Sequence, residues 1–114
     1  MKYINLGLKV KDLTNEKKIL EELINGSCLQ GSVEIDYKTL VDMFGQPNLG
    51  LSEDRKVECE WTILTTSGIA TIYNYKSGIH YSEEGLPKEK ITDWHIGGHN
   101  KIVANIIKQV ITKD

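Results

Sequence analysis

Two runs of alternating side chains in residues 57–75 constrain the fold more than any other feature of this chain. The first run reads VECEWTI over 57–63, and the second reads IATIYNY over 69–75. A period of two is the period of a β-strand that buries one face. The short turn between the runs contains Gly68. The pattern therefore predicts an antiparallel β-hairpin at the centre of the chain.

The first half of the chain carries signals for two helices and two further strands. Residues 4–10 alternate in hydrophobicity and predict a strand, and residues 32–35 predict a short one. Thr14 is placed to cap a helix over 15–24 that ends at Asn25-Gly26. A second helix is expected between the cap Asp36 and the closing Gly45. Its buried face comprises Leu40, Val41 and Phe44.

The second half alternates loops with one strand and one helix. Residues 46–55 and 77–90 are rich in turn-forming residues and predict loops. Residues 91–96 predict a last strand, which Gly97-Gly98 breaks. His99 or Asn100 then opens a final helix, whose apolar stripe is Ile102, Val103, Ile106, Ile107 and Val110. We expect one α+β domain over 1–114, with a small, mostly antiparallel sheet and a central hairpin packed against about three helices.

Charge and composition exclude several classes of function. The formal net charge of -2 argues against general nucleic-acid binding, which requires a basic surface. No stretch approaches 18 consecutive apolar residues, so no membrane-spanning helix is expected. The start of the chain has no apolar run like that of a signal peptide, which predicts a cytoplasmic protein. We expect Cys28 and Cys59 to be two buried free thiols.

No standard catalytic or metal-binding motif occurs. The chain contains no G-x-S-x-G elbow, and Cys59 lies within a predicted strand rather than at an exposed turn. Glu58 and Glu60 share one strand face, which an exposed polar face explains as simply as acid–base work. Asp93, His95 and His99 have a metal-like spacing, but the two glycines between the histidines argue against one shared helix. We therefore expect no enzyme, no metal and no cofactor.

Two blocks have the chemistry of a small ligand site. One block ends the hairpin and comprises Tyr73, Asn74, Tyr75 and Lys76. The other runs from a strand into a helix and comprises Trp94, His95, Gly97, Gly98, His99 and Asn100. Aromatic rings stack on a nucleobase, an amide reads its edge, and a lysine or a helix N-terminus binds phosphate. The blocks thus predict a nucleotide-like ligand.

A simpler interpretation of the same two blocks is structural. In that interpretation Trp61 and Trp94 fill the core, the tyrosines pack on the sheet, and Gly97-Gly98 is only a strand-to-helix turn. The sequence leaves both interpretations open.

Four segments resemble a group of small uncharacterised phage and prophage proteins. The segments are Tyr37-x-x-Leu40 with Phe44-Gly45-x-Pro47, Val57-Glu58-x-Glu60-Trp61, ATIYNYK over 70–76 and ITDWHIGG over 91–98. The resemblance covers the chain from Gly31 on, and its most specific parts are the Tyr-Asn-Tyr-Lys and Trp-His-Ile-Gly-Gly blocks. Because the group has no activity to carry over, the resemblance implies a setting rather than a reaction. Small phage accessory proteins of this type often act against host defence.

The expected function is non-enzymatic binding and sequestration of a nucleotide-like immune signal in the host cell cytoplasm. A homo-oligomer is expected, because interfaces between copies form deep pockets. The alternative is a protein–protein inhibitor of a host defence system, of the anti-CRISPR type. It would use Glu58, Glu60 and the 77–90 loop as an exposed surface. A third hypothesis is a nucleotide-degrading enzyme, which is disfavoured because the sequence shows no evident catalytic base or set of metal ligands.

Overall fold

The computed structural model describes residues 3–5, 26–65 and 67–112. These ranges contain the strands β1 (Tyr3–Asn5), β2 (Cys28–Glu34), β3 (Glu60–Thr65), β4 (Gly68–Tyr73) and β5 (Asp93–Gly98). They also contain the helices α2 (Tyr37–Phe44) and α3 (Lys101–Thr112) and the 3₁₀ turn η1 (Lys88–Lys90). The expected strand over 4–10 and the expected helix over 15–24 lie mostly outside the described residues.

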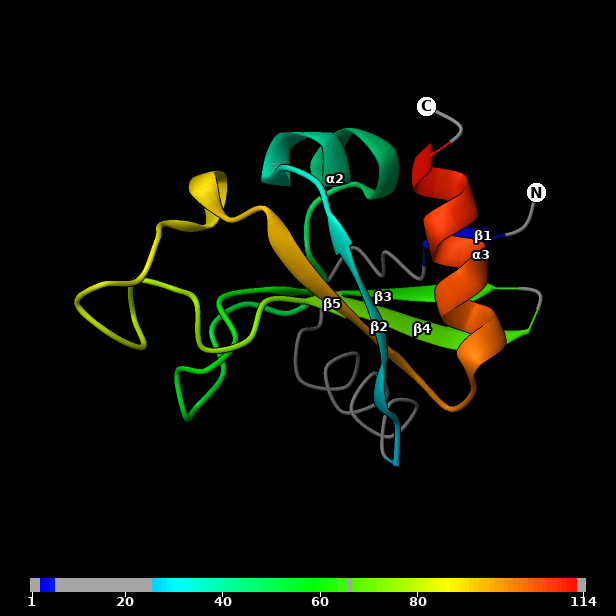
Figure 1. The fold of residues 1–114 in the computed structure, drawn as a ribbon, viewed down its shortest axis with the longest axis horizontal. Helices are drawn as coiled ribbons and strands as arrows, with labels where there is room; N and C mark the ends of the chain where they lie inside the picture. The colour runs from blue at the N-terminus through cyan, green and yellow to red at the C-terminus, as the bar shows by residue number, and fades with distance from the viewer. Residues whose placement is uncertain (1–2, 6–25, 66, 113–114) are drawn as a thin grey trace, which may run out of the picture.

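The described strands form one antiparallel sheet in the order β1-β3-β4-β5-β2. The predicted hairpin is present as β3 and β4, with Trp61 opposite Ile72 and Ile63 opposite Ala70. These strands lie inside the sheet, and β1 and β2 form its edges in Figure 1. The alternation along 57–75 therefore encodes the middle of the sheet.

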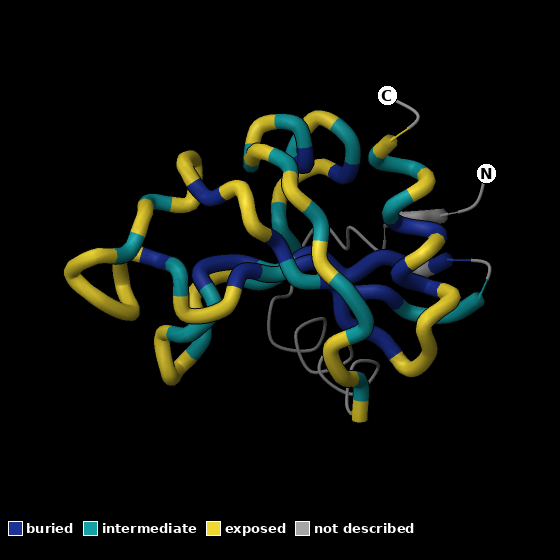
Figure 2. Tube along the Cα trace, viewed as in Figure 1, coloured by how far each residue is buried: buried dark blue, intermediate teal, exposed yellow. Residues whose placement is uncertain are grey.

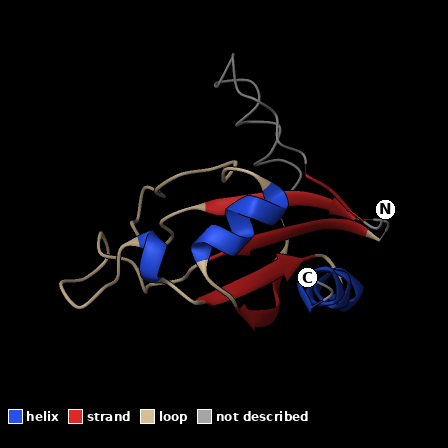
Figure 3. Ribbon diagram, turned by 90° about the horizontal axis from the view of Figure 1, so that it is seen from above, coloured by secondary structure: helices blue, strands red, loops and turns tan. Residues whose placement is uncertain are grey.

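Both helices bury their apolar sides against one face of the sheet. The shared core contains large strand residues and residues from each helix, namely Trp61, Ile63, Ile72, Trp94, Ile96, Leu40, Phe44, Val103 and Ile107. Helix α3 crosses β3 and β4 steeply in Figure 1 and is seen end-on in Figure 3. Figure 2 shows the buried residues gathered along the sheet and the exposed ones along the loops.

The expectation of about three helices is wrong for the described part of the chain, which contains two α-helices and one 3₁₀ turn. Helix α2 begins at the predicted cap, where the Asp36 Oδ1 accepts a hydrogen bond from the Thr39 N–H at 3.3 Å. It ends at Gly45, which has φ +83°. Lys88–Lys90, predicted as loop, forms the 3₁₀ turn. No helix in the described residues is both long and apolar enough to cross a membrane.

The last strand was predicted to end before the two glycines, and the structure contradicts this. Gly97 and Gly98 are part of β5 and are paired with β4 on one side and β2 on the other. A Cβ at Gly98 would clash with Val103 Cγ2 of α3. Gly98 thus allows helix α3 to pack closely on the strand, and neither glycine breaks the strand.

Strand β2 is longer than predicted, because it begins at Cys28 rather than at Ser32. Of the two thiols expected to be buried, Cys59 is buried and Cys28 is exposed. Cys28 lies near a register shift between Leu29 and Gly31 at the sheet edge. Edge strands have only one neighbour, so the alternation of buried residues is a weaker guide there.

Candidate functional site

Two loops that are far apart in the sequence meet at one end of the sheet. The loop over 45–59 is joined to β3 where Leu49 and Glu60 exchange backbone hydrogen bonds of 3.0 and 2.9 Å. The loop over 74–92 is joined to it where the Lys76 N–H donates to the Lys56 carbonyl at 2.7 Å. Figure 1 shows both loops at the end of the sheet away from α3.

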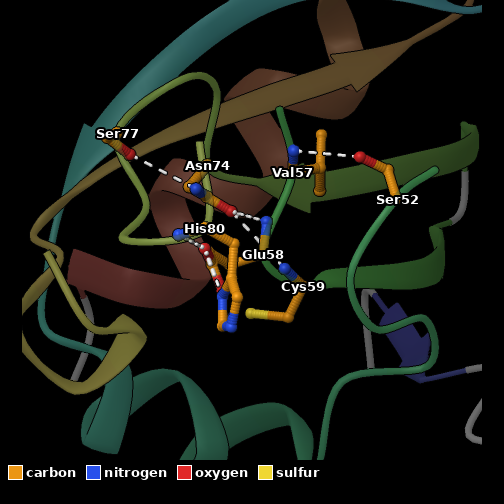
Figure 4. Close-up of polar contacts among 7 residues, drawn as sticks. All are labelled: Ser52, Val57, Glu58, Cys59, Asn74, Ser77 and His80. Atoms are coloured by element: carbon orange, nitrogen blue, oxygen red, sulfur yellow. Dashed lines mark hydrogen bonds and ion pairs between the residues drawn. The ribbon is translucent and has the colours of Figure 1, made fainter. Parts of the chain in front are cut away.

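Asn74 joins the two loops from inside the protein. Its side chain is fully buried, and its Oδ1 accepts hydrogen bonds from the N–H groups of Glu58 at 2.7 Å and Cys59 at 3.4 Å. Its Nδ2 donates to the Ser77 hydroxyl at 3.3 Å. Figure 4 shows these bonds converging on the amide. Asn74 was expected to read a ligand, but its amide is used within the protein.

The carboxylate of Glu58 is held by His80. The Glu58 side chain is 6% exposed, and both of its oxygens contact the His80 Nδ1, at 3.0 and 2.8 Å. The His80 backbone N–H adds a third hydrogen bond, to Oε1 at 2.9 Å. A Cβ at Gly78 would overlap the Glu58 side chain, so the loop can close around this carboxylate only with glycine there. Glu58 was expected on an exposed strand face, and the structure buries it.

Glu58 and His80 line a cleft of about 450 Å³ between the two loops. Its apolar wall comprises Pro47, Leu49, Leu51, Ile79 and Pro87. Cys59 also lines the cleft, and Figure 4 shows its side chain pointing toward the His80 ring. Burial raises the pKa of the Cys59 thiol to about 12. The thiol is therefore protonated at neutral pH and is not an activated nucleophile.

The opposite face of the sheet carries a row of polar side chains in register. Glu60 pairs with Tyr73, Tyr73 pairs with His95, and His95 pairs with Ser32, across four neighbouring strands. The rings of Tyr73 and His95 meet edge to face with centroids 5.5 Å apart. A Cβ at Gly97 would lie 3.2 Å from the Tyr73 Cε1 and 2.6 Å from the Thr71 Oγ1. Glycine at 97 therefore makes room for the Thr71 hydroxyl and for the neighbouring Tyr73 ring.

The row continues into an exposed group of rings around one lysine. Tyr75 stacks on His95 with centroids 6.0 Å apart. The Nζ of Lys76 lies 5.2 Å from the Tyr75 centroid and 6.0 Å from the Tyr81 centroid. Tyr75 and Tyr81 are 44% and 40% exposed. We call this group, Tyr73, Tyr75, Lys76, Tyr81 and His95, the aromatic surface.

Glu60 borders the aromatic surface and differs from an ordinary surface carboxylate. Burial raises the pKa of Glu60 from 4.5 to about 7. The pKa of Tyr73 is also raised, first by burial and then by the charge of Glu60. Near neutral pH the Glu60 carboxyl is thus divided between a hydrogen-bond donor form and a charged form. The sequence places Glu60 in an alternating strand beside Glu58 and gives no sign of its burial.

The structure separates the predicted residues into two groups. Tyr73, Tyr75, Lys76 and His95 lie together, whereas Trp94 is fully buried with its ring 5.4 Å from that of Trp61. The Trp94 Nε1 donates to the Ile91 carbonyl at 3.2 Å, so both the ring and its polar atom are used in the core. Of the two interpretations of Trp94, the core one is correct.

The start of α3, which was predicted to bind an anion through backbone N–H groups, is built differently from that prediction. The backbone of Gly97 and Gly98 is engaged on both sides of β5, so its N–H groups belong to the sheet rather than to a ligand. Asn100 caps α3, because its Oδ1 accepts from the Val103 N–H at 3.2 Å. Its Nδ2 donates to the Ser67 carbonyl at 3.2 Å. His99 is exposed beside this cap.

Sequence reasoning did not bring together four residues of the two sites, namely Glu58, Glu60, His80 and Tyr81. Glu58 and His80 are 22 positions apart, and the second lies in an irregular loop, so no spacing links them. Glu60 and Tyr73 could have been paired by counting outward from the hairpin turn. Among the residues that the structure describes, no group of three potential metal ligands occurs.

Comparison with known proteins places this chain in no family. No protein-family model matches the sequence, and no curated protein matches it either.

Proposed function

We propose that the aromatic surface binds a small nucleotide-like ligand. The observation that carries the proposal is the shared ring of His95, which meets Tyr73 edge to face and stacks on Tyr75. Two separate parts of the chain thereby supply one exposed group of rings. A nucleobase can stack on such rings, and each stacked base contributes about 1–3 kcal/mol in other proteins.

The charges around the rings suit an anionic ligand. Lys76 presents an ammonium group between two exposed phenol rings, where it can neutralise a phosphate. The whole chain has a net charge of -2, so this local cation, rather than a general basic surface, would have to attract the ligand. Ser32 and the protonated form of Glu60 add hydrogen-bonding groups in the same row.

The proposed setting is a phage-type accessory protein that sequesters an immune-signalling nucleotide without degrading it. Sequestration needs a tight site and no chemistry, and the aromatic surface offers stacking and charge. We include a homo-oligomer and the host cell cytoplasm in this proposal. A second copy would deepen an exposed surface into a pocket. Light scattering that gives a dimer or larger assembly would support the oligomer, and a monomer at working concentrations would contradict it.

Calorimetric titration with a panel of mono-, di- and cyclic nucleotides tests the binding. We expect Tyr75→Ala to weaken binding of the best nucleotide about 5- to 150-fold, the equivalent of about 1–3 kcal/mol of lost stacking. Ile102→Ala is the matched control, because Ile102 is also an exposed apolar residue but lies on α3. Absence of heat with every nucleotide would overturn the proposal. Recovery of intact nucleotide from the denatured complex would separate sequestration from degradation.

One observation favours a second candidate, a protein–protein inhibitor. The loop over 77–90 exposes the large apolar side chains of Ile79, Tyr81 and Leu86 near the acidic pair Glu83 and Glu84. Exposed apolar residues beside charged ones are typical of binding surfaces. This surface differs from the one expected from the sequence, because Glu58 is buried. Leu86→Asp would abolish inhibition of a defence protein and leave nucleotide binding unchanged.

A further inference from the structure

We infer that the cleft between the two loops is a second ligand site, for a small uncharged molecule with an apolar body and one N–H or O–H donor. A phenol or an indole represents this chemical class. The inference rests on Glu58, His80 and the cleft wall, and it does not depend on the proposed function of the aromatic surface.

Glu58 determines which nitrogen of His80 is free. A carboxylate can only accept hydrogen bonds, so the Nδ1 that contacts both Glu58 oxygens must carry the proton. In neutral imidazole the other nitrogen, Nε2, then has a lone pair and accepts. The third bond, from the His80 backbone N–H to the same carboxylate, holds the residue in place. His80 lines the cleft, so the neutral form of its ring adds this acceptor to the lining.

The charges that line the cleft favour an uncharged ligand. Lys88 and Glu89 have opposite charges, and the Lys88 Nζ lies 5.4 Å from the centroid of the Tyr37 ring. The remaining charge is the Glu58 carboxylate, whose oxygens are already used by His80. An anion entering the cleft would meet two carboxylates, Glu58 and Glu89, and a single lysine, Lys88. A neutral donor avoids that repulsion and satisfies Nε2.

The size and walls of the cleft suit a molecule of one or two rings. Its volume of about 450 Å³ lies in the range of small-molecule sites, which are mostly apolar with a few placed polar groups. Leu51 and Ile79 are largely exposed at its rim and would lose contact with water when a ligand binds. The protonated Cys59 thiol adds a soft apolar wall.

Paired probes test the donor requirement. Phenol and anisole differ by the O–H donor, and indole and N-methylindole differ by the N–H donor. We expect each donor probe to bind about 3- to 10-fold more tightly than its methylated partner, the effect of one hydrogen bond. Benzoate tests the charge argument and is expected to bind more weakly than phenol. Equal affinities within each pair, or tighter binding of benzoate, would overturn the inference.

His80→Asn isolates the role of Nε2. The asparagine Nδ2 can replace the Nδ1 donor to Glu58, but it offers nothing in the place of Nε2. We expect this variant to bind phenol and anisole equally, whereas the control His99→Asn keeps the difference. Nitrogen-15 NMR of the unmodified protein is the second measurement, and it should find the proton of His80 on Nδ1. A ring that carries a proton on Nε2, whether neutral or doubly protonated, would overturn the inference even if His80→Asn failed to fold. Loss of nucleotide binding alone would leave it intact.

Discussion

Glu58 and Glu60 lie two residues apart, yet they serve two regions with different chemistry. Glu58 enters the cleft and receives three contacts from His80, which fix its position. Glu60 faces the aromatic surface, where burial raises its pKa to about 7. The difference arises because β3 begins at Glu60, whereas Glu58 belongs to the preceding loop. One region thus has a satisfied carboxylate, and the other has a carboxyl group that titrates near neutrality.

The largest expected effect comes from Asn74→Ala, which removes the side chain that joins the loop over 45–59 to the loop over 74–92. The change leaves two buried N–H groups without their acceptor, so we expect a loss of about 3–4 kcal/mol in the free energy of unfolding. Urea denaturation measures it, with the exposed Asn105→Ala as the control. A loss below about 1 kcal/mol would mean that Asn74 does not hold the loops together.

A smaller effect is expected from the titration of Glu60. The folded protein holds a proton on Glu60 up to about pH 7, whereas the unfolded chain releases it near pH 4.5. Stability from this group is therefore complete below pH 4.5 and is lost as the pH rises to 7, by about 2–3 kcal/mol. Glu60→Gln should flatten this slope in denaturation curves between pH 4.5 and 7.5. The exposed Glu34→Gln serves as the control, and an unchanged slope in Glu60→Gln would contradict the raised pKa.

Two glycine-to-alanine variants distinguish the cleft from the aromatic surface. Each is expected to lower the free energy of unfolding by about 1–2 kcal/mol. Gly97→Ala should displace the Thr71 side chain, crowd the adjacent Tyr73 ring and perturb the aromatic surface alone. Gly78→Ala should crowd Glu58 and perturb the cleft alone. Chemical shifts of Tyr73 and His80 distinguish the two outcomes. If either variant disturbs both residues equally, the regions are one coupled site.

Much of the fold can be predicted from local patterns, because those patterns reflect burial in central elements. The alternation over 57–75 predicts β3 and β4, and Asp36 and Gly45 mark the ends of α2. The same reasoning fails at Gly97 and Gly98, since glycine signals a break unless a neighbour needs the space of the missing Cβ. Here Tyr73 and Val103 need that space, and only the assembled fold reveals it.

The candidate site is less predictable than the fold, because its residues come from irregular loops. Tyr73, Tyr75 and Lys76 are neighbours in the sequence, so their grouping could be foreseen, and His95 joins them through strand pairing. Trp94 has an aromatic ring like that of a base-stacking residue, but the structure buries this ring in the core. The contact between Glu58 and His80 depends on the path of the 74–92 loop, for which no periodic pattern exists.

An NMR titration that follows the histidine rings tests the distinction between the two regions most directly. The chain has three histidines, and His80 lies in the cleft, His95 lies on the aromatic surface and His99 lies beside the cap of α3. We predict that a nucleotide shifts the His95 resonances and leaves those of His80 unchanged. Indole should do the reverse, and His99 should respond to neither. Joint movement of His80 and His95 with either probe would contradict two separate sites.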